Sequence, residues 1–342
     1  MTSLQRVLTA LGQKEPDRVP LFLLLTMHGA KELGMSIKEY FSKGENVAKG
    51  QLLLREKYGN DCYYAFFYAP IEVEAWGADV IYREDGPPNS GEPLIKNIDD
   101  ILKLKPPVVK GNLALEKNLE CIRLLKENGA DEVPIIGVVM SPFSLPVMQM
   151  GFEKYLILMH EHPETFEHLM KLNEEFIVSW ANAQIEAGAT AITYFDPVSS
   201  TSIIPRELFL KTGFQIAKRT ISKINGPTAI HLASGRCLPI IDDLAQTGTA
   251  IVGTSVLEDL VEVKSQCNGR LTVLGNLNGI EMCRWTKREA ENAVKDAIDK
   301  AAAGGGFILS DNHGEIPYQV SDEIIMTIAE TTRKYGKYPL KR

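Results

Sequence analysis

The stretch that decides the fold is residues 304–317, GGGFILSDNHGEIP. Three glycines lead into the apolar run 307–309, and polar residues follow it. Apolar runs without alternation are typical of strands that are covered on both faces, as in parallel sheets. We therefore interpret this stretch as a buried strand whose far end delivers polar side chains to a site. Those side chains are Asp311, Asn312, His313 and Glu315.

The same pattern recurs along the chain and predicts eight strands, each separated from the next by helical periodicity. The other seven strand-like runs are residues 19–25, 61–68, 133–140, 189–195, 228–232, 249–252 and 271–274. Well-patterned helices are predicted over 112–129, 165–188, 205–224 and 286–303, and residues 72–83 are predicted to be extended and locally paired, before a surface loop at 86–93.

Strands that alternate with helices pair in parallel through crossover connections. Eight of them without a break in composition favour an α/β fold of the closed (β/α)8 TIM-barrel type over an open doubly wound sheet. The prediction is a single domain, residues 1–342, with an N-terminal helical extension at 3–13.

Composition narrows the class of protein. The formal net charge of −7 and the pI near 5.5 argue against nucleic-acid or anionic-membrane binding, which needs a concentrated basic face. No run approaches the length of a membrane span. The five cysteines are widely spaced and form no CxxC pair, which predicts reduced thiols in a cytoplasmic protein.

In (β/α)8 barrels the active site lies at the carboxyl ends of the strands, so the residues that leave the predicted strands are the candidates. These are His28, Tyr68, Ser141, Tyr194, Asp196, His231, Ser234, Asn276, Asn278, Asp311, Asn312, His313 and Glu315.

Two chemistries remain open for the histidines on this list. Imidazole and carboxylate are zinc ligands, so His231, His313, Glu315 and Asp196 form a possible metal-ligand set. Alternatively, His231 and His313 act as general acids or hydrogen-bond donors to an anionic substrate, with Asp196 as a base and Tyr194 as an acid. A purely structural role for His231 or Asp196 is the third possibility.

Several segments, in this order, resemble the uroporphyrinogen decarboxylase superfamily. The segments are RVP at 18–20, GNDCYYAFFYAPIEVEAWGADV at 59–80, EDGPPNSGEPLI at 84–95, AGATAITYFDP at 187–197, HLASG at 231–235, LGNLN at 274–278 and NHGEIP at 312–317. The resemblance covers essentially the whole chain, and it implies a (β/α)8 barrel.

The decarboxylases of this superfamily hold a tetrapyrrole with an arginine-rich segment after the first strand and an aspartate after the second. Here these positions read LLLTMHGAKELG at 23–34 and AFFYAP at 65–70, without arginine and without aspartate. Guanidinium groups are the natural partners of carboxylates. The sequence therefore disfavours a substrate with many carboxylates.

The other branch that the chain resembles is the corrinoid-dependent methyltransferases. Members that methylate a thiol hold zinc with a His-x-Cys pair on the fifth strand and a cysteine after the eighth. This chain has His231 but Ala233 two positions later, and no cysteine between Asp311 and Pro317. The departure predicts a zinc with harder ligands that would act on oxygen or nitrogen.

The functional prediction is thus a zinc-assisted methyltransferase that moves a methyl group between a small O-methyl or N-methyl substrate, or a thiol, and cobalamin. A separate corrinoid protein would carry the cobalamin, with Asn276, Asn278 and Ser234 as cofactor-binding residues. The alternatives are a cofactor-free decarboxylase and a non-catalytic barrel that binds a tetrapyrrole or a corrinoid protein.

Overall fold

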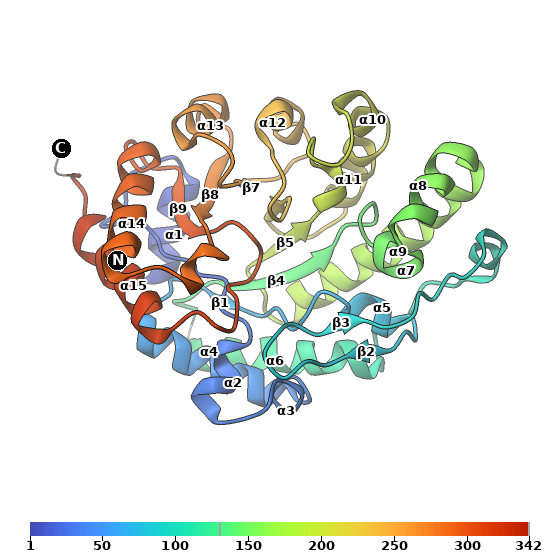
Figure 1. The fold of residues 1–342 in the computed structure, drawn as a ribbon, viewed down its shortest axis with the longest axis horizontal. Coiled ribbons are helices and arrows are strands. Elements are labelled where there is room, and N and C mark those ends of the chain that lie inside the picture. The colour runs from blue at the N-terminus through green and yellow to red at the C-terminus, as the bar shows by residue number, and fades with distance from the viewer. Residues whose placement is uncertain (130, 341–342) are drawn as a thin grey trace.

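A computed structural model of the chain describes residues 1–129 and 131–340. Its centre is a curled parallel sheet of seven strands in the order β1-β4-β5-β6-β7-β8-β9, with helices around the outside (Figure 1). The strands are β1 Tyr63–Tyr64, β4 Ile135–Met140, β5 Ala191–Phe195, β6 Thr228–His231, β7 Ile251–Gly253, β8 Thr272–Leu277 and β9 Phe307–Asp311. The predicted α/β class and parallel pairing are confirmed.

Helices connect these strands, as the crossover argument predicts. The longer ones are α1 Ser3–Leu11, α4 Gly44–Tyr58, α6 Leu113–Gly129, α8 Phe152–Glu161, α9 Pro163–Ala187, α11 Gly213–Ile221, α13 Leu260–Cys267, α14 Lys287–Ala301 and α15 Asp322–Tyr335. The shorter ones are α2 His28–Leu33, α3 Ile37–Tyr40, α5 Ile71–Ala75, α7 Pro146–Met150, α10 Arg206–Lys211 and α12 Ile241–Leu244. None of the described helices is long and apolar enough to cross a membrane.

Residues 19–25 lie between the two ends of the sheet. On one side, Phe22 N donates to Leu309 O and Leu309 N donates to Pro20 O, both at 2.9 Å. On the other side, Asp61 N donates to Leu21 O at 2.7 Å. This segment was predicted as a regular strand, but only Leu21 forms a bridge, a parallel one to Leu309.

Side chains explain why residues 19–25 are not a full strand. Leu21 N donates to Asp61 Oδ2 at 2.8 Å, and Leu23 N donates to Asn60 Oδ1 at 3.1 Å. The amide of Asn60 also donates to Leu23 O at 3.0 Å. These side chains satisfy backbone groups that a neighbouring strand would otherwise pair with.

The predicted extended structure over residues 72–83 is wrong in its first half. Residues 71–75 form α5, which begins after Pro70, and only Val80–Ile81 is a strand, β2. It pairs antiparallel with β3, Asn89–Ser90, inside the segment predicted to be a surface loop. The helix predicted over 205–224 is divided at Thr212, whose backbone (φ −123°, ψ −88°) is not helical, into α10 and α11.

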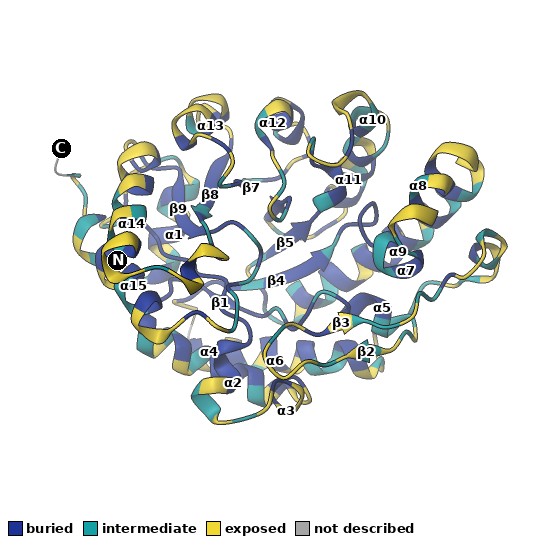
Figure 2. Ribbon diagram, in the orientation of Figure 1, coloured by how far each residue is buried: buried dark blue, intermediate teal, exposed yellow. Residues whose placement is uncertain are grey.

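The apolar core has two layers, one on each face of the curled sheet. Neighbouring residues of segment 19–25 belong to different clusters: Leu21 and Leu23 pack with the helices, whereas Phe22 and Leu24 pack with a second cluster. That second cluster joins residues from both ends of the sheet, which can meet only across its concave face. Figure 2 shows the burial along the strands. The cluster comprises Val7, Ala10, Phe22, Leu24, Cys62, Tyr64, Val138, Phe195, Leu274 and Ile308.

A buried ionic cluster fixes α1 and residues 19–25 beneath this inner layer. Asp61, 1% exposed, accepts from Arg6 Nη1 at 2.7 Å and from Arg18 Nη1 at 2.7 Å. It also accepts from Ser3 Oγ at 3.0 Å. With the Leu21 amide already described, two cations and two neutral donors satisfy the one carboxylate, which is the condition under which a buried charge is tolerated.

Glu72 on α5 predicts a pH dependence of stability. The carboxyl is buried against Met140 N at 3.1 Å, and burial raises the pKa of Glu72 to about 7. Because the folded chain then holds a proton that the unfolded chain has released, the free energy of unfolding falls as pH rises from about 4.5 to 7, by about 3 kcal/mol.

Glu72→Gln should reduce the fall in stability between pH 5 and pH 8 by about 3 kcal/mol, the share of Glu72, which urea unfolding at the two pH values measures. The buried Asp311 and Glu315, whose pKa values are also raised, should keep their own shares of the fall. The exposed Glu164 on α9 provides the matched control, and Glu164→Gln should keep the wild-type pH profile. An unchanged profile in Glu72→Gln contradicts the assignment.

Candidate functional site

His231 lies at the carboxyl end of β6 and faces the concave side of the sheet. It pairs in register with Phe195 of β5, and the two rings lie 4.8 Å apart. The imidazole is fully buried, and Ala233 N donates to its Nδ1 at 3.0 Å. Its Nε2 is buried, and none of the described residues forms a hydrogen bond with it. Burial, with a smaller contribution from His313, lowers the pKa of His231 to about 3, so the ring is neutral.

Residues 312–317 cross the opening at the carboxyl ends of the strands, above this ring. This opening is called the mouth below. His313 Nδ1 forms a short hydrogen bond with Ser234 Oγ in the loop that follows β6. Tyr64 of β1 donates from its hydroxyl to Gly314 O at 2.9 Å. Gly314 lies flat on the ring of Phe195, where a Cβ would approach within 2.7 Å. The segment is thus attached to both β6 and β1.

The second ring nitrogen of His313, Nε2, lies near one hydrogen-bond acceptor and one hydrogen-bond donor. Nε2 lies 3.3 Å from Asn278 Oδ1, an acceptor. When the Asn312 amide is oriented so that both of its atoms are satisfied, its nitrogen donates to the same Nε2 at 3.0 Å. Burial lowers the pKa of His313, which is half-buried.

Two carboxyl groups flank the same segment. Asp311, at the end of β9, accepts from Leu24 N at 3.1 Å and from His313 N at 3.2 Å. Glu315 accepts from Thr26 Oγ1 at 2.9 Å. Burial raises the pKa of Asp311 to about 6 and the pKa of Glu315 to about 7. Neither forms an ion pair with a lysine or arginine in the described part of the chain.

Asp196 is held in a cage of serine hydroxyls. Its Oδ1 accepts from Ser141 at 2.5 Å and from Ser144 at 2.7 Å, and its Oδ2 accepts from Ser199 at 2.5 Å. Its backbone N donates to His231 O at 2.9 Å. Burial raises the pKa of Asp196 despite these hydroxyls. The carboxylate of Asp196 binds the residues that follow β4, and its backbone N binds the end of β6. Asp196 therefore joins the ends of β4, β5 and β6.

The other predicted residues are more scattered. Tyr194 is buried in the cluster between the sheet and the helices, on the opposite face from Phe195 and His231. Asn276 lies at the mouth, and its amide donates to Ser255 O at 3.0 Å. His28 is buried beside Tyr318, with ring centroids 6.3 Å apart. The structure therefore brings together His231, His313, Ser234, Asn278 and the carboxyls of segment 311–315.

The predicted zinc ligands do not converge as a metal centre. Among the residues that the structure describes, no group of three or more His, Cys, Asp or Glu side chains is placed to hold a metal ion. Asp196 is occupied by three hydroxyls, and Glu315 is bound to Thr26. Zinc sites need at least three protein ligands, so the donor set does not fit the ion.

Sequence reasoning left out the residues that shape the mouth. Tyr64, Phe195 and Gly314 lie within strands or loops that looked purely structural, and Thr26 carried no signal at all. The alternation along β1 was the available clue, since Tyr64 and Phe66 fall on one face with ring centroids 5.5 Å apart.

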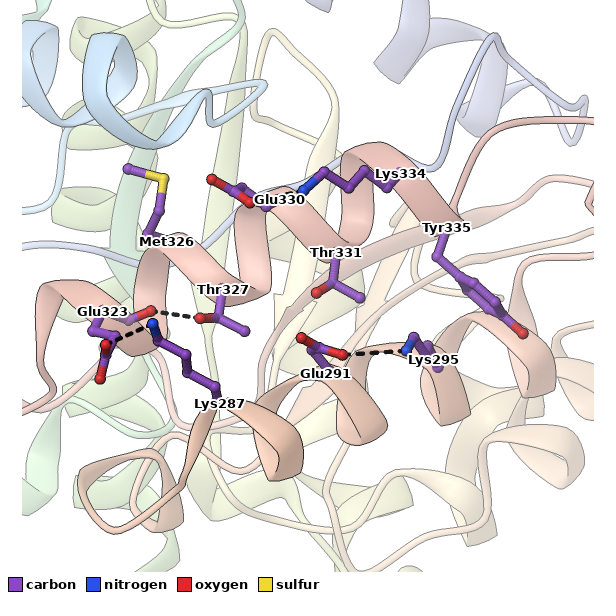
Figure 3. A pocket seen from close by; sticks show the side chains of 10 residues that line it. All are labelled: Lys287, Glu291, Lys295, Glu323, Met326, Thr327, Glu330, Thr331, Lys334 and Tyr335. Carbon is purple, nitrogen blue, oxygen red and sulfur yellow. Dashed lines mark hydrogen bonds and ion pairs between the residues drawn. The ribbon is translucent and has the colours of Figure 1, made fainter.

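A separate groove of about 480 Å³ lies outside the sheet, between α14 and α15. Figure 3 shows that its charged side chains pair with one another. Lys287 pairs with Glu323 at 2.8 Å, and Lys295 pairs with Glu291 at 3.3 Å. With its charges already paired, the groove offers no reactive group comparable to the mouth.

The chain belongs to the uroporphyrinogen decarboxylase family, whose model, "Uroporphyrinogen decarboxylase (URO-D)", matches residues 2–335. The Methylcobamide:CoM methyltransferase MtaA of Methanosarcina barkeri is 26% identical over 325 residues, covering 88% of this chain and 91% of that protein. The uroporphyrinogen decarboxylase of Hydrogenovibrio crunogenus is 22% identical over 364 residues, covering 97% and 98%. The resemblance predicted from the sequence is confirmed.

Solved structures agree on the fold. A methyltransferase from Methanosarcina mazei superimposes with a TM-score of 0.85 at 20% identity, covering 98% of this chain and 99% of that one. A B12-independent methionine synthase from Shewanella sp. W3-18-1 gives a TM-score of 0.60 at 13% identity, covering 93% and 98%.

Proposed function

We propose that the chain is a corrinoid-dependent methyltransferase that takes the methyl group of a small methylated compound, with a corrinoid protein as its partner. The relatives named methyltransferase support the class of reaction. The corrinoid would supply the electron pair that accepts the methyl group. We also infer that residues 19–25 take the eighth position of the barrel, supported by their hydrogen bonds to β9 and to Asp61.

The observation that carries this proposal is the charge of the mouth. Asp311 and Glu315 lie beside His313, and no arginine or lysine of the described residues pairs with either carboxyl. A substrate that bears several carboxylates would face these two carboxyl groups there, without a guanidinium partner that pairs with them among the described residues. The mouth is therefore unsuited to a tetrapyrrole acid and suited to an uncharged or cationic methyl donor.

Within this proposal the chain's own side chains bind and orient the substrate. Phe195 and Phe66, whose ring centroids lie 6.1 Å apart, offer an apolar surface beside His231. Ser234 is exposed at the rim, and Asn278 is half-buried below it, so both can contact an approaching corrinoid. The predicted zinc stays a prediction, and we derive no step through it because the donor set does not fit.

The test mixes the purified chain with cob(I)alamin and a panel of methylated compounds, and follows the visible spectrum for methylation of the cobalt. In parallel, the chain is given uroporphyrinogen and carbon dioxide release is measured. We expect methylation from at least one compound and no carbon dioxide. Carbon dioxide release without methylation would show a decarboxylase, and neither activity would favour a binding protein.

A further inference from the structure

The ring of His231 carries an unused hydrogen-bonding atom inside the mouth. Its Nδ1 receives the backbone N–H of Ala233 at 3.0 Å, whereas its Nε2 is buried and has no partner in the described part of the chain. A buried polar atom without a partner is costly, and it is rarely retained unless something else pairs with it. The neighbours of the ring are the aromatic face of Phe195 and, as tightly packed backbone, Gly253.

The contact with Ala233 determines which nitrogen carries the proton. A nitrogen that accepts an N–H must present its lone pair, so Nδ1 is unprotonated. In a neutral imidazole the proton is then on Nε2. His231 therefore presents an N–H donor, and not a lone pair, to the mouth.

This tautomer disagrees with the metal role predicted from the sequence. A histidine that binds a metal through one nitrogen donates the N–H of its other nitrogen to an acceptor. Here the other nitrogen faces a donor, and turning the ring over would bring the Cδ2–H, which accepts no hydrogen bond, against the Ala233 N–H. Both nitrogens are therefore unsuited to a metal ion in this arrangement.

We infer that His231 is a fixed hydrogen-bond donor to the leaving oxygen of an O-methyl substrate, and that the chain selects methyl ethers over N-methylated ammonium compounds. An ether oxygen has lone pairs that accept from Nε2–H. A fully substituted ammonium nitrogen has none. This inference rests on the proposed function and narrows its substrate class.

In the proposed methyl transfer, His231 donates a hydrogen bond and keeps its proton. The bond between the methyl carbon and oxygen breaks, both electrons stay on oxygen, and the carbon takes the electron pair supplied by the reduced corrinoid of the partner. Negative charge grows on oxygen, so the hydrogen bond from Nε2 strengthens as the bond breaks. When segment 312–317 opens again, the oxygen takes one proton from water and leaves as an alcohol or phenol.

Access to Nε2 requires segment 312–317 to move. In the structure this segment is attached to Ser234 and Tyr64 and packs on Phe195, whose ring lies 4.8 Å from that of the fully buried His231. Opening breaks the hydrogen bonds of this segment with Ser234, Asn278, Tyr64 and Thr26 and leaves the pairing between the strands in place. Closing over a bound ether would exclude water from the reacting oxygen.

The first experiment reads the tautomer without relying on activity. Nitrogen-15 NMR of the chain labelled at histidine is expected to show one imidazole with an unprotonated Nδ1 and a protonated Nε2, absent from His231→Gln. Metal analysis of the same samples is expected to show no zinc that depends on His231. A protonated Nδ1, or stoichiometric zinc lost in His231→Gln, overturns the inference.

The second experiment compares 2-methoxyphenol and tetramethylammonium as methyl donors to cob(I)alamin. We expect transfer from the ether only, a loss of about 10²–10³-fold in His231→Leu and retention within about tenfold in His231→Gln, whose amide still donates. His160→Leu, on the exposed face of α8, is the matched control and should keep the wild-type rate.

The outcomes separate this inference from the proposed function. Transfer from tetramethylammonium, or transfer from the ether that His231→Leu leaves intact, overturns the donor role while the methyltransferase stands. Transfer from neither donor, with the tautomer as expected, overturns the proposed function and the substrate assignment together.

Discussion

Asp61→Ala is expected to lower the free energy of unfolding by about 3–5 kcal/mol, because it removes the buried anion that pairs with both Arg6 and Arg18. Asp61 is 1% exposed, and the side chains of Arg6 and Arg18 that it pairs with are 9% and 14% exposed. The variant also frees Leu21 N and the Ser3 hydroxyl. Denaturant unfolding followed by circular dichroism measures the loss.

Asp17 provides the matched control for Asp61. It also pairs with Arg6, at 2.7 Å, but its side chain is 41% exposed. Asp17→Ala should therefore cost no more than about 1 kcal/mol. Equal losses in the two variants would show that burial of Asp61 adds nothing and would contradict the proposed role of the cluster.

The second large effect is expected at Asp196. Asp196→Ala leaves the hydroxyls of Ser141, Ser144 and Ser199 without their shared acceptor in a buried site, and we expect a loss of about 2–4 kcal/mol. The change also loosens the junction of β4, β5 and β6 next to His231. Thermal unfolding and denaturant unfolding report it directly.

Asp196→Asn distinguishes a structural carboxylate from a catalytic one. The amide oxygen still accepts from hydroxyls, so the variant should keep most of its stability. If Asp196 only holds the strand ends in place, the rate of methyl transfer should decrease only where the free energy of unfolding decreases, in both variants. A large loss of transfer in a stable Asp196→Asn would instead support the role of base predicted from the sequence.

The sequence predicted the strands well wherever an apolar run lacked alternation. The runs at 133–140 and 189–195 became β4 and β5 with small changes at their ends. At 19–25 the strand is incomplete because the side chains of Asp61 and Asn60 bind Leu21 N and Leu23 N, which no periodicity reveals. At 61–68 only Tyr63–Tyr64 is a strand, and the side chains of Gln51 and Asn118 bind Tyr64 N and Ala65 O. Sequence reasoning also failed at α5, where a helix of five residues is too short to display a period.

The candidate site likewise has a part that the sequence predicted and a part that it did not. Position in the chain was enough to place His231 and His313 at one mouth, since both follow strands of the same parallel sheet. The chemical role of each site residue could not be predicted from the sequence, because it depends on hydrogen bonds that the fold determines. Ala233 N reaching Nδ1 and three serines surrounding Asp196 are local geometries that residue types alone do not encode.

The bridge between Leu21 and Leu309 has a consequence for synthesis of the chain. On the ribosome, residues 19–25 emerge early, but their partner strand β9 is made almost last. Until then one edge of the growing sheet has no neighbour, and its apolar inner face is open to other chains. Nascent chains stalled before residue 307 should therefore depend on chaperones more strongly than released ones.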